Sequence, residues 1–305
     1  ISSWLKRHHP AAFFAGLLNS QPMGFYSPSQ LIQDARRHDV TVLPIDVNRS
    51  SWDHQLLDSR SAGHAQPPIR LGLRLVKGLS REGAQRVVEA RRHGPFRQVS
   101  NLRQRTRLGK RDMEALADAD ALASLSGHRH QSQWQIMALE QARPLLQDEQ
   151  REAASYFDDG VQLPAPGVAE EVLADYRATG LTLRAHPMSL LRNRTPFNRC
   201  KRHSDLAMLG NNRFVRIAGL VTCRQRPGSA SGVLFLTLED ETGNSNIVVW
   251  QRTQQQFRRP LMTAQLLLVN GTLEIKNNVI HIIAGALYDY THELHALQVT
   301  SRDFH

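Results

Sequence analysis

Hydrophobic residues at the start of the chain recur at helical spacing. This pattern predicts a helix between Ser3 and Leu18, with Pro10 as a kink or boundary within it. Ser27 is a candidate N-cap and Pro28 a first helical residue, so a second helix is predicted to begin there. The first part of the chain is therefore expected to be mainly helical.

Residues 70–150 show further helical spacing, arranged as two related units. In the first unit, the turn Gly78-Leu79-Ser80 precedes a helix predicted from Arg81 to Arg92. In the second, the turn Leu108-Gly109-Lys110 precedes a helix predicted from Arg111 to Ala119. The pattern is that of a helix–hairpin–helix used twice.

A linker with short helices is expected at residues 151–210. Its first part is acidic and contains Gly160 and Pro164, a composition typical of a linker. A short helix from Glu170 to Thr179 follows, and Gly180 is its expected C-terminal cap.

From Phe214 onward, apolar and polar residues alternate with a period of two, which indicates strands. Five strands are predicted, with one helix between the third and the fourth, at 215–221, 233–238, 246–250, 252–258 (helix), 266–274 and 279–284. This order is typical of an OB-fold barrel, expected at 211–292 and followed by a tail at 293–305. The predicted fold class is therefore α+β multidomain: a mostly helical N-terminal part with a tandem helix–hairpin–helix, then a five-stranded OB-fold β-barrel.

The composition allows packed cores. Hydrophobic residues make up 41% and charged residues 22% of the 305 residues, a length that suits about two domains. The longest apolar runs are about ten residues, short of the ~20 that span a bilayer, so no membrane contact is expected. The two cysteines, Cys200 and Cys223, are too few for a disulfide framework or a four-ligand zinc site.

Positive charge is concentrated in one segment. The chain carries 38 Lys and Arg against 28 Asp and Glu, for a net charge of +10, and residues 70–130 alone carry 14 against 6. Such a balance favours a polyanionic partner. A solvated helix face is the alternative explanation of a charge run, but the glycine turns in this segment favour phosphate binding.

A hairpin that leads into a helix presents backbone N–H groups, and together with the helix dipole these bind a phosphate without reading bases. The candidate contacts in the two hairpins are Lys77, Gly78, Leu79, Arg81, Gly109, Lys110 and Arg111. The usual pattern has glycine on both sides of the hydrophobic hairpin residue. Ser80 stands at the second of these positions in the first hairpin, so a looser approach is expected there. The alternative is a purely structural pair of helices.

The predicted barrel carries a second set of candidates. The alternating leucines of its second strand should face the core, so Phe235 points outward, where an aromatic ring can stack a base for ~1–3 kcal/mol. Trp250, at the end of the third strand, either stacks a base or closes the barrel end. Arg224 and Arg226, between the first two strands, are candidate phosphate contacts.

The sequence contains no recognisable catalytic constellation. It has no P-loop, no nucleophile elbow and no H-E-x-x-H helix. We therefore expect no catalytic residue, no metal site and no cofactor in this chain. The acidic turn Glu239-Asp240-Glu241 is expected to be a solvated strand end.

Several stretches closely resemble the bacterial C-family DNA polymerase alpha subunit, in its error-prone, damage-inducible branch. They are residues 3–10, 17–28, 34–38, 71–78, 175–180 with His186-Pro187, and 235–243. The first block, from Ser3-Trp4-Leu5-Lys6 to Gly24-Phe25-Tyr26-Ser27-Pro28, is highly specific, and the match covers essentially the whole chain.

The resemblance implies the C-terminal DNA-binding portion of a longer polymerase that acts in damage-induced translesion synthesis. Residues 1–69 would be the C-terminal part of the fingers, 70–150 would grip duplex DNA, and the barrel would lie near the single-stranded template. The family's palm aspartates, which hold magnesium, have no match here, so no cofactor is expected in this chain.

The resemblance also implies partners and a compartment. A clamp-binding peptide has no convincing match between 131 and 213, which fits a contact with the sliding clamp through an accessory translesion protein. A cytoplasmic location is expected. Two alternatives remain open: a stand-alone DNA-binding module without catalysis, and a scaffold that docks an accessory protein through the acidic residues 140–175.

Overall fold

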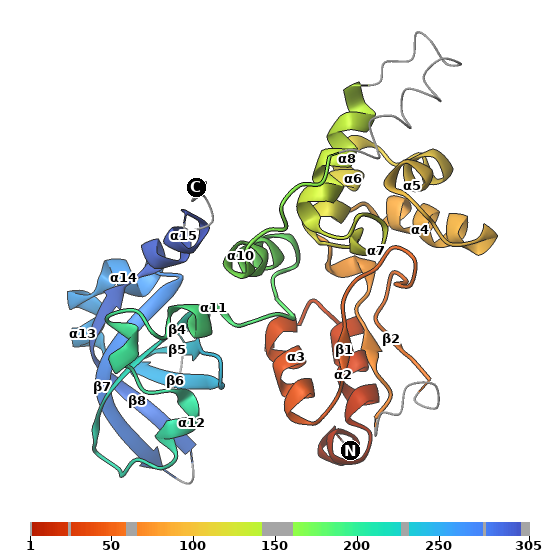
Figure 1. Cartoon of the computed structure of the whole chain (residues 1–305). Helices are drawn as coiled ribbons and strands as arrows, with labels where there is room; N and C mark the ends of the chain where they lie inside the picture. The colour runs from red at the N-terminus through yellow and green to blue at the C-terminus, as the bar shows by residue number, and fades with distance from the viewer. Residues whose placement is uncertain are drawn as a thin grey trace. The chain divides into compact units, whose positions relative to one another are not determined.

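The computed structural model describes residues 2–23, 26–58, 66–141, 161–226, 232–276 and 279–299 (Figure 1). The chain divides into two compact units: Ile1–Gly167 with Ala174–Leu183, and Val168–Leu173 with Arg184–His305. The boundary runs through helix α10 (Val168–Thr179), which contributes residues to both units. The five-part division expected from the sequence is finer than this grouping.

The first unit is mainly helical. Its helices are α1 (Ser2–His8), α2 (Pro10–Asn19), α3 (Pro28–Arg37), α4 (Arg81–Ala90), α5 (Val99–Thr106), α6 (Lys110–Asp118), α7 (Ala123–Ser126) and α8 (Arg129–Gln141). Pro10 separates α1 from α2 as predicted, because its ring stands at the first position of the second helix. Ser27 caps α3 in a complete capping box with Gln30.

A small sheet joins the helices of the first unit. Strand β3 (Ile69–Arg70) lies between β1 (Val42–Leu43) and β2 (Gln55–Leu56), parallel to the first and antiparallel to the second. The chain then enters the first hairpin through the 3₁₀ turn η2 (Leu73–Leu75), so the helix before this hairpin is a single short turn.

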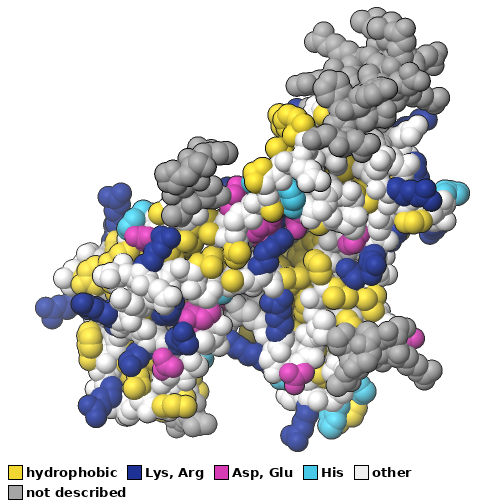
Figure 2. Space-filling model, in the orientation of Figure 1, with side chains coloured by type: hydrophobic (Ala, Val, Ile, Leu, Met, Phe, Trp, Pro, Cys, Tyr) yellow, Lys and Arg dark blue, Asp and Glu magenta, His cyan; other side chains and the backbone are white. Residues whose placement is uncertain are grey.

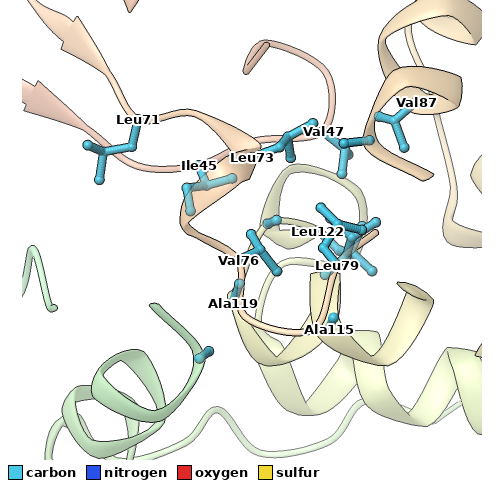
Figure 3. Packing of buried hydrophobic residues seen from close by; sticks show 14 of the residues in the cluster. Ile45, Val47, Leu71, Leu73, Val76, Leu79, Val87, Ala115, Ala119 and Leu122 are labelled. Carbon is cyan, nitrogen blue, oxygen red and sulfur yellow. The ribbon is translucent and has the colours of Figure 1, made fainter. Parts of the chain in front are cut away.

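One hydrophobic core runs through the first unit. Figure 3 shows the hairpin residue Leu79 beside Leu122, which follows α6, with Ala115 of α6 below them, and Val47 and Leu73 belong to the same cluster. All five side chains are buried. Residues before position 70 and the two hairpins therefore fold against a shared core, and this core holds the hairpins in place.

The second unit is built on a closed five-stranded barrel with the order β4-β5-β6-β8-β7. Its strands and helices are β4 (Phe214–Gln225), β5 (Leu234–Glu239), β6 (Asn244–Val249), α13 (Gln251–Gln256), α14 (Arg258–Thr263), β7 (Leu266–Lys276) and β8 (Val279–Asp289). The predicted α+β class is confirmed, and the helical insertion between the third and fourth barrel strands is present as two short helices.

Three further elements cover one side of the barrel. They are α11 (Pro187–Leu191), the 3₁₀ turn η4 (Phe197–Arg199) and α15 (Thr291–Val299). Short helices were expected within 151–210, whereas the helix α15 and the packing of these elements on the barrel were not. Their buried residues, among them Met188, Phe197 and Leu294, pack on the outer side chains of β4 and β7, such as Ala218 and Leu268. The outward residues of β5 and β6 belong to no hydrophobic cluster.

The acidic turn after β5 is buried, so the expectation of a solvated strand end was wrong. Glu239 is 1% and Asp240 5% exposed. The Asp240 carboxylate accepts the backbone N–H groups of Thr242 and Gly243 and that of His203, in α12 (His203–Leu206). The turn therefore anchors the segment before the barrel by filling the acceptor positions of a buried carboxylate.

Arg192 completes this buried cluster. Its Nε donates to Glu241 Oε1 at 2.8 Å and its terminal nitrogen to Oε2 at 2.7 Å, a bidentate pair. Although burial of the guanidinium opposes its charge, these bonds raise the pKa of Arg192 above its ordinary value.

His54 fixes the approach of two segments that lead into the first hairpin. Its Nδ1 accepts the backbone N–H of Gly72 at 3.1 Å. A side chain at Gly72 would meet the carbonyl oxygen of Trp52 at 2.3 Å, so only glycine fits. Burial, with a smaller effect of Arg74, lowers the pKa of His54 to about 4, and the Asp53 charge offsets part of this shift.

We expect the chain to lose stability as the pH falls from about 6.5 to about 4. The unfolded histidine, with a pKa near 6.5, binds a proton in this window that the native one does not, so the contribution of His54 is fully present above pH 6.5. The loss by pH 4 is at most about 3 kcal/mol. Urea unfolding at several pH values would measure it. His54→Gln should flatten this part of the profile; an unchanged slope would contradict the assignment.

Candidate nucleic-acid interface

The two hairpins of the first unit follow the same backbone course. Gly78 opens the first turn with a left-handed φ of +87°, and Arg107 opens the second with +50°. Buried leucines follow at once, Leu79 and Leu108. A left-handed backbone is uncommon for a residue other than glycine, yet Arg107 adopts it at the position that Gly78 holds in the first hairpin. The two hairpins are therefore equivalent residue by residue.

The next residue in each hairpin is the N-cap of a helix. Ser80 is the N-cap residue of α4 and Gly109 that of α6, both with a φ of −73°, but only Ser80 caps its helix with a side chain. A glycine is expected on each side of the hydrophobic hairpin residue, but each hairpin has only one of the two. The first hairpin has its glycine at the first position, and the second has Gly109 at the last.

Asp112 closes the first hairpin from the side of the second. The Ser80 backbone N–H donates to Asp112 Oδ1 and the Ser80 hydroxyl to Oδ2, each at 2.9 Å. The Gly83 N–H in turn donates to Ser80 Oγ at 2.9 Å. A carboxylate therefore already occupies the N-terminus of α4, the position at which a helix dipole favours an anion.

Lys77 also faces inward with its polar groups. Its backbone N–H donates to the carbonyl of Ala178 at 2.8 Å, and its Nζ to that of Tyr176 at 3.1 Å. Both acceptors lie in the last turns of α10. Lys77 and Gly78 are exposed, and Leu79 is buried. Arg81 is exposed beside the Trp52 ring at 5.9 Å.

The second hairpin leaves its helix start open. Gly109 supplies no side chain to cap α6, whose first N–H groups have no acceptor within the helix. Lys110, Arg111 and Arg107 are exposed around this point. Lys110 Nζ lies 3.8 Å from Glu114, one turn along an exposed helix face, where an ion pair is weak. Positive side chains therefore surround the N-terminus of α6.

Part of the positive charge of 70–130 is structural. Six arginines donate to backbone carbonyls or to carboxylates of the first unit: Arg70, Arg74, Arg86, Arg91, Arg105 and Arg129. Eight basic side chains are exposed: Lys77, Arg81, Arg86, Arg92, Arg97, Arg107, Lys110 and Arg111. The surface of this segment is therefore positive, but less so than the sequence count suggests.

In the second unit, the strand register brings apolar outward residues into one row. Phe235 of β5 pairs with Val248 of β6, and Val248 pairs with Ile283 of β8. Gln225 of β4 flanks Phe235 on the other side. The leucines between these positions are buried in the barrel core, as predicted, so the row lies on the outer face.

A polar row runs beside the apolar one. Thr237 pairs with Asn246 and Asn246 with His281, while Cys223 of β4 flanks Thr237. Trp250 follows β6 as the N-cap residue of α13 and is 53% exposed, so it does not close the barrel end. The outer face of β5, β6 and β8 thus combines an aromatic ring, hydrogen-bonding side chains and an exposed indole at its border.

Arg224 and Arg226 lie on the other side of β4. Arg224 pairs with the inward Leu236, and its guanidinium donates to the carbonyls of Leu261 and Ala264 at the end of α14. Burial lowers the pKa of Arg224. Arg226 donates to Gln254 Oε1 at 2.8 Å. The structure does not bring this pair together with Phe235.

Sequence reasoning missed residues at both places. Aligning Leu79 with Leu108 would have identified Arg107 as the partner of Gly78. The strand alternation would have placed Asn246 and His281 beside Phe235. Nothing in the local sequence indicates that Asp112 reaches across to the first hairpin, because this contact joins residues 32 positions apart.

Neither a metal cluster nor a membrane span is found among the described residues. Within them, no group of three or more His, Cys, Asp or Glu side chains could hold a metal ion. Nor does any described helix have the length and apolar character needed to cross a membrane.

Family models match the hairpin region and the barrel. Residues 39–132 match the helix-hairpin-helix motif, and residues 215–290 match the OB-fold nucleic acid binding domain. The chain therefore carries two modules of the kind that bind nucleic acid, one in each unit.

The relatives of the chain are error-prone DNA polymerases, which confirms the resemblance drawn from the sequence. Over its full length, the chain is 53% identical to the error-prone DNA polymerase of Saccharophagus degradans, 50% to that of Teredinibacter turnerae and 49% to that of Pseudomonas aeruginosa. The chain spans 29–30% of the length of these proteins. Among solved structures, asparaginyl-tRNA synthetase from Pyrococcus horikoshii aligns with 30% of the chain at 18% identity and a TM-score of 0.23, a likeness too slight to guide interpretation.

We expect Gly83→Ala to destabilise the chain and Gly109→Ala to leave it nearly unchanged. A Cβ at Gly83 would meet Asp112 Oδ2 at 2.5 Å and Ser80 Oγ at 2.7 Å, whereas one at Gly109 meets nothing within 4 Å. The Gly83 variant should lose about 1–3 kcal/mol in denaturant unfolding. Equal stabilities of the two variants would show that Asp112 does not hold the hairpins together.

Proposed function

We propose that this chain is the DNA-binding portion of an error-prone DNA polymerase, holding duplex DNA at the hairpins and single-stranded template at the barrel. The observation that carries the proposal is the pair of surfaces on the two matched modules. One surrounds an uncapped helix start with exposed basic side chains, and the other presents the half-buried ring of Phe235 and the exposed indole of Trp250 at the outer barrel face. The similarity of the whole of this chain to part of the error-prone polymerases supports the proposal.

At the hairpins, the second turn is the phosphate grip. Its helix start is uncapped, and Arg107, Lys110 and Arg111 supply positive charge around it. The first turn already has the Asp112 carboxylate at its helix start, and this negative charge repels a phosphate there. Of the sequence candidates, Lys77 then serves mainly to bind the last turns of α10, Gly78 and Leu79 shape the turn and its core contact, and Arg81 adds charge at the surface.

At the barrel, the outer face suits a single strand. Unpaired bases stack on exposed aromatic rings whatever their identity, which duplex DNA does not allow because its bases are already stacked. Thr237, Asn246 and His281 lie next to Phe235 and can bond to base edges or sugar oxygens.

In the whole polymerase, these surfaces would support template-directed synthesis across damaged DNA. The magnesium ions of nucleotidyl transfer would be held by residues outside this sequence. An accessory translesion protein would supply the contact with the sliding clamp, and the protein would act in the bacterial cytoplasm. Purified full-length polymerase with the substitutions below would test this part, by primer extension on a template that carries an abasic site.

Duplex binding should depend more on the second hairpin than on the first. Lys110→Ala with Arg111→Ala should lower the slope of log affinity against log salt by about two, one for each lost phosphate contact. Lys77→Ala with Arg81→Ala removes the same charge and should change the slope by less than half as much. Fluorescence anisotropy with a duplex at several salt concentrations measures both. A larger effect of the Lys77 and Arg81 pair would contradict the assignment.

Phe235→Ala and Trp250→Ala should each weaken the binding of single-stranded oligonucleotides by about 1–3 kcal/mol, because each removes one stacking platform. Duplex affinity should stay close to wild type. Phe214→Ala is the matched control, since Phe214 is an exposed phenylalanine at the start of β4, opposite Thr272 of β7 and outside the proposed row. Equal losses for single-stranded and duplex DNA would show that Phe235 is only a structural residue.

A further inference from the structure

A second positive surface lies on the helices that follow Trp250. Between Glu241 and Glu274 the sequence contains no Asp or Glu, yet it contains Arg252, Arg258 and Arg259. All three arginines are exposed on α13 and α14. Figure 2 shows dark-blue side chains at the left edge of the molecule, where Figure 1 places these two helices.

These arginines are not used to hold the fold. Among the described residues, none of the three guanidinium groups takes part in an ion pair or a side-chain hydrogen bond. The structural work is done by their neighbours: Gln254 is buried and donates to the carbonyls of Gly232 and Val249. The exposed face of α13 is therefore left to Arg252 and to polar glutamines.

The local charge is stronger than these three residues alone provide. Arg224 and Arg226 lie beneath the same helices, bonded to carbonyls and to Gln254. Asp289 is the acidic group whose charge acts on Arg224, and its carboxylate accepts the N–H and hydroxyl of Thr291. Three guanidinium groups therefore lie on α13 and α14 and two more lie beneath these helices at this end of the barrel.

We infer that α13 and α14 form a phosphate track for the single strand that stacks on the barrel face. This inference rests on the proposed function of that face. Trp250, the exposed indole at the border of the face, is the residue directly before α13, so a strand leaving it meets Arg252 first and then Arg258 and Arg259. The barrel face supplies stacking, and the helices supply charge.

A nucleic-acid backbone fits this surface better than an acidic protein does. Arginine and glutamine side chains both donate to phosphate oxygens, and the exposed face of α13 consists of these two residue types: Gln251, Arg252, Gln255 and Gln256. A stable protein interface needs an apolar centre, and this face of α13 has no apolar residue.

The test compares two triple variants of the 305-residue chain. Arg252→Gln, Arg258→Gln and Arg259→Gln remove the track. Arg199→Gln, Lys201→Gln and Arg213→Gln remove the same charge from exposed positions before and at the start of the barrel. Oligo(dT) probes of about 4 and about 12 nucleotides would be titrated by anisotropy at several salt concentrations.

The track variant should bind the long probe about tenfold or more weakly, with a salt slope lower by about two, since each phosphate contact on a single strand contributes about 0.7. Its affinity for the short probe should change little, and the control variant should resemble wild type with both. Equal behaviour of the two triple variants would overturn the inference, as would equal losses with both probes.

The outcomes separate this inference from the proposed function. If the wild-type chain binds both probes and Phe235→Ala weakens binding while the track variant does not, only the track is wrong. If the wild-type chain does not bind oligo(dT), both are wrong. Loss of binding to a polyglutamate peptide, with unchanged binding of the long probe, would assign the arginines to an acidic protein and overturn the track.

Discussion

Buried carboxylates hold both units of this chain in shape. In the first unit, Asp112 bonds the start of one hairpin helix from the other hairpin, and the buried pair of Arg129 with Asp175 ties α8 to the end of α10. In the second, the acidic turn at Glu239-Asp240-Glu241 binds Arg192 and the segment before the barrel. A carboxylate withdrawn from water is costly unless it is bonded, and removing one partner of a buried ion pair costs about 3–5 kcal/mol, so each of these groups fixes its surroundings.

The burial of these carboxylates affects the charge of the protein surface. Asp112 keeps a phosphate away from the first hairpin, whereas the carboxylates of Asp175 and Glu241 are each offset by a guanidinium group. The exposed arginines and lysines act through their full charge. The arginines divide in the same way: Arg91 and Arg105 donate to carbonyls inside the first unit, whereas Arg107 and Arg111 face solvent. The positive surface therefore consists mainly of the basic side chains that are not bonded inside the fold.

Much of the architecture could be predicted from the chain alone. The proline and serine signals at the first helices, the two hairpins and the five strands with their helical insertion are local patterns, and the structure confirms them. The acidic turn shows where this reasoning fails. Its sequence resembles any exposed strand end, because the residues that bury it, Arg192 and His203, come from a distant segment. The packing of α11, η4 and α15 on one side of the barrel was missed for the same reason.

The sequence by itself determined the kind of modules, their order, and the outward direction of Phe235, because backbone periodicity and turn chemistry depend on neighbouring residues. Only the tertiary structure decided which polar groups are available. It showed Asp112 at the first hairpin, left the second hairpin open, turned Arg224 toward α14, and exposed Trp250. The physical reason is that a charged side chain is placed by the acceptors or donors it finds in space, and those lie tens of residues away along the chain.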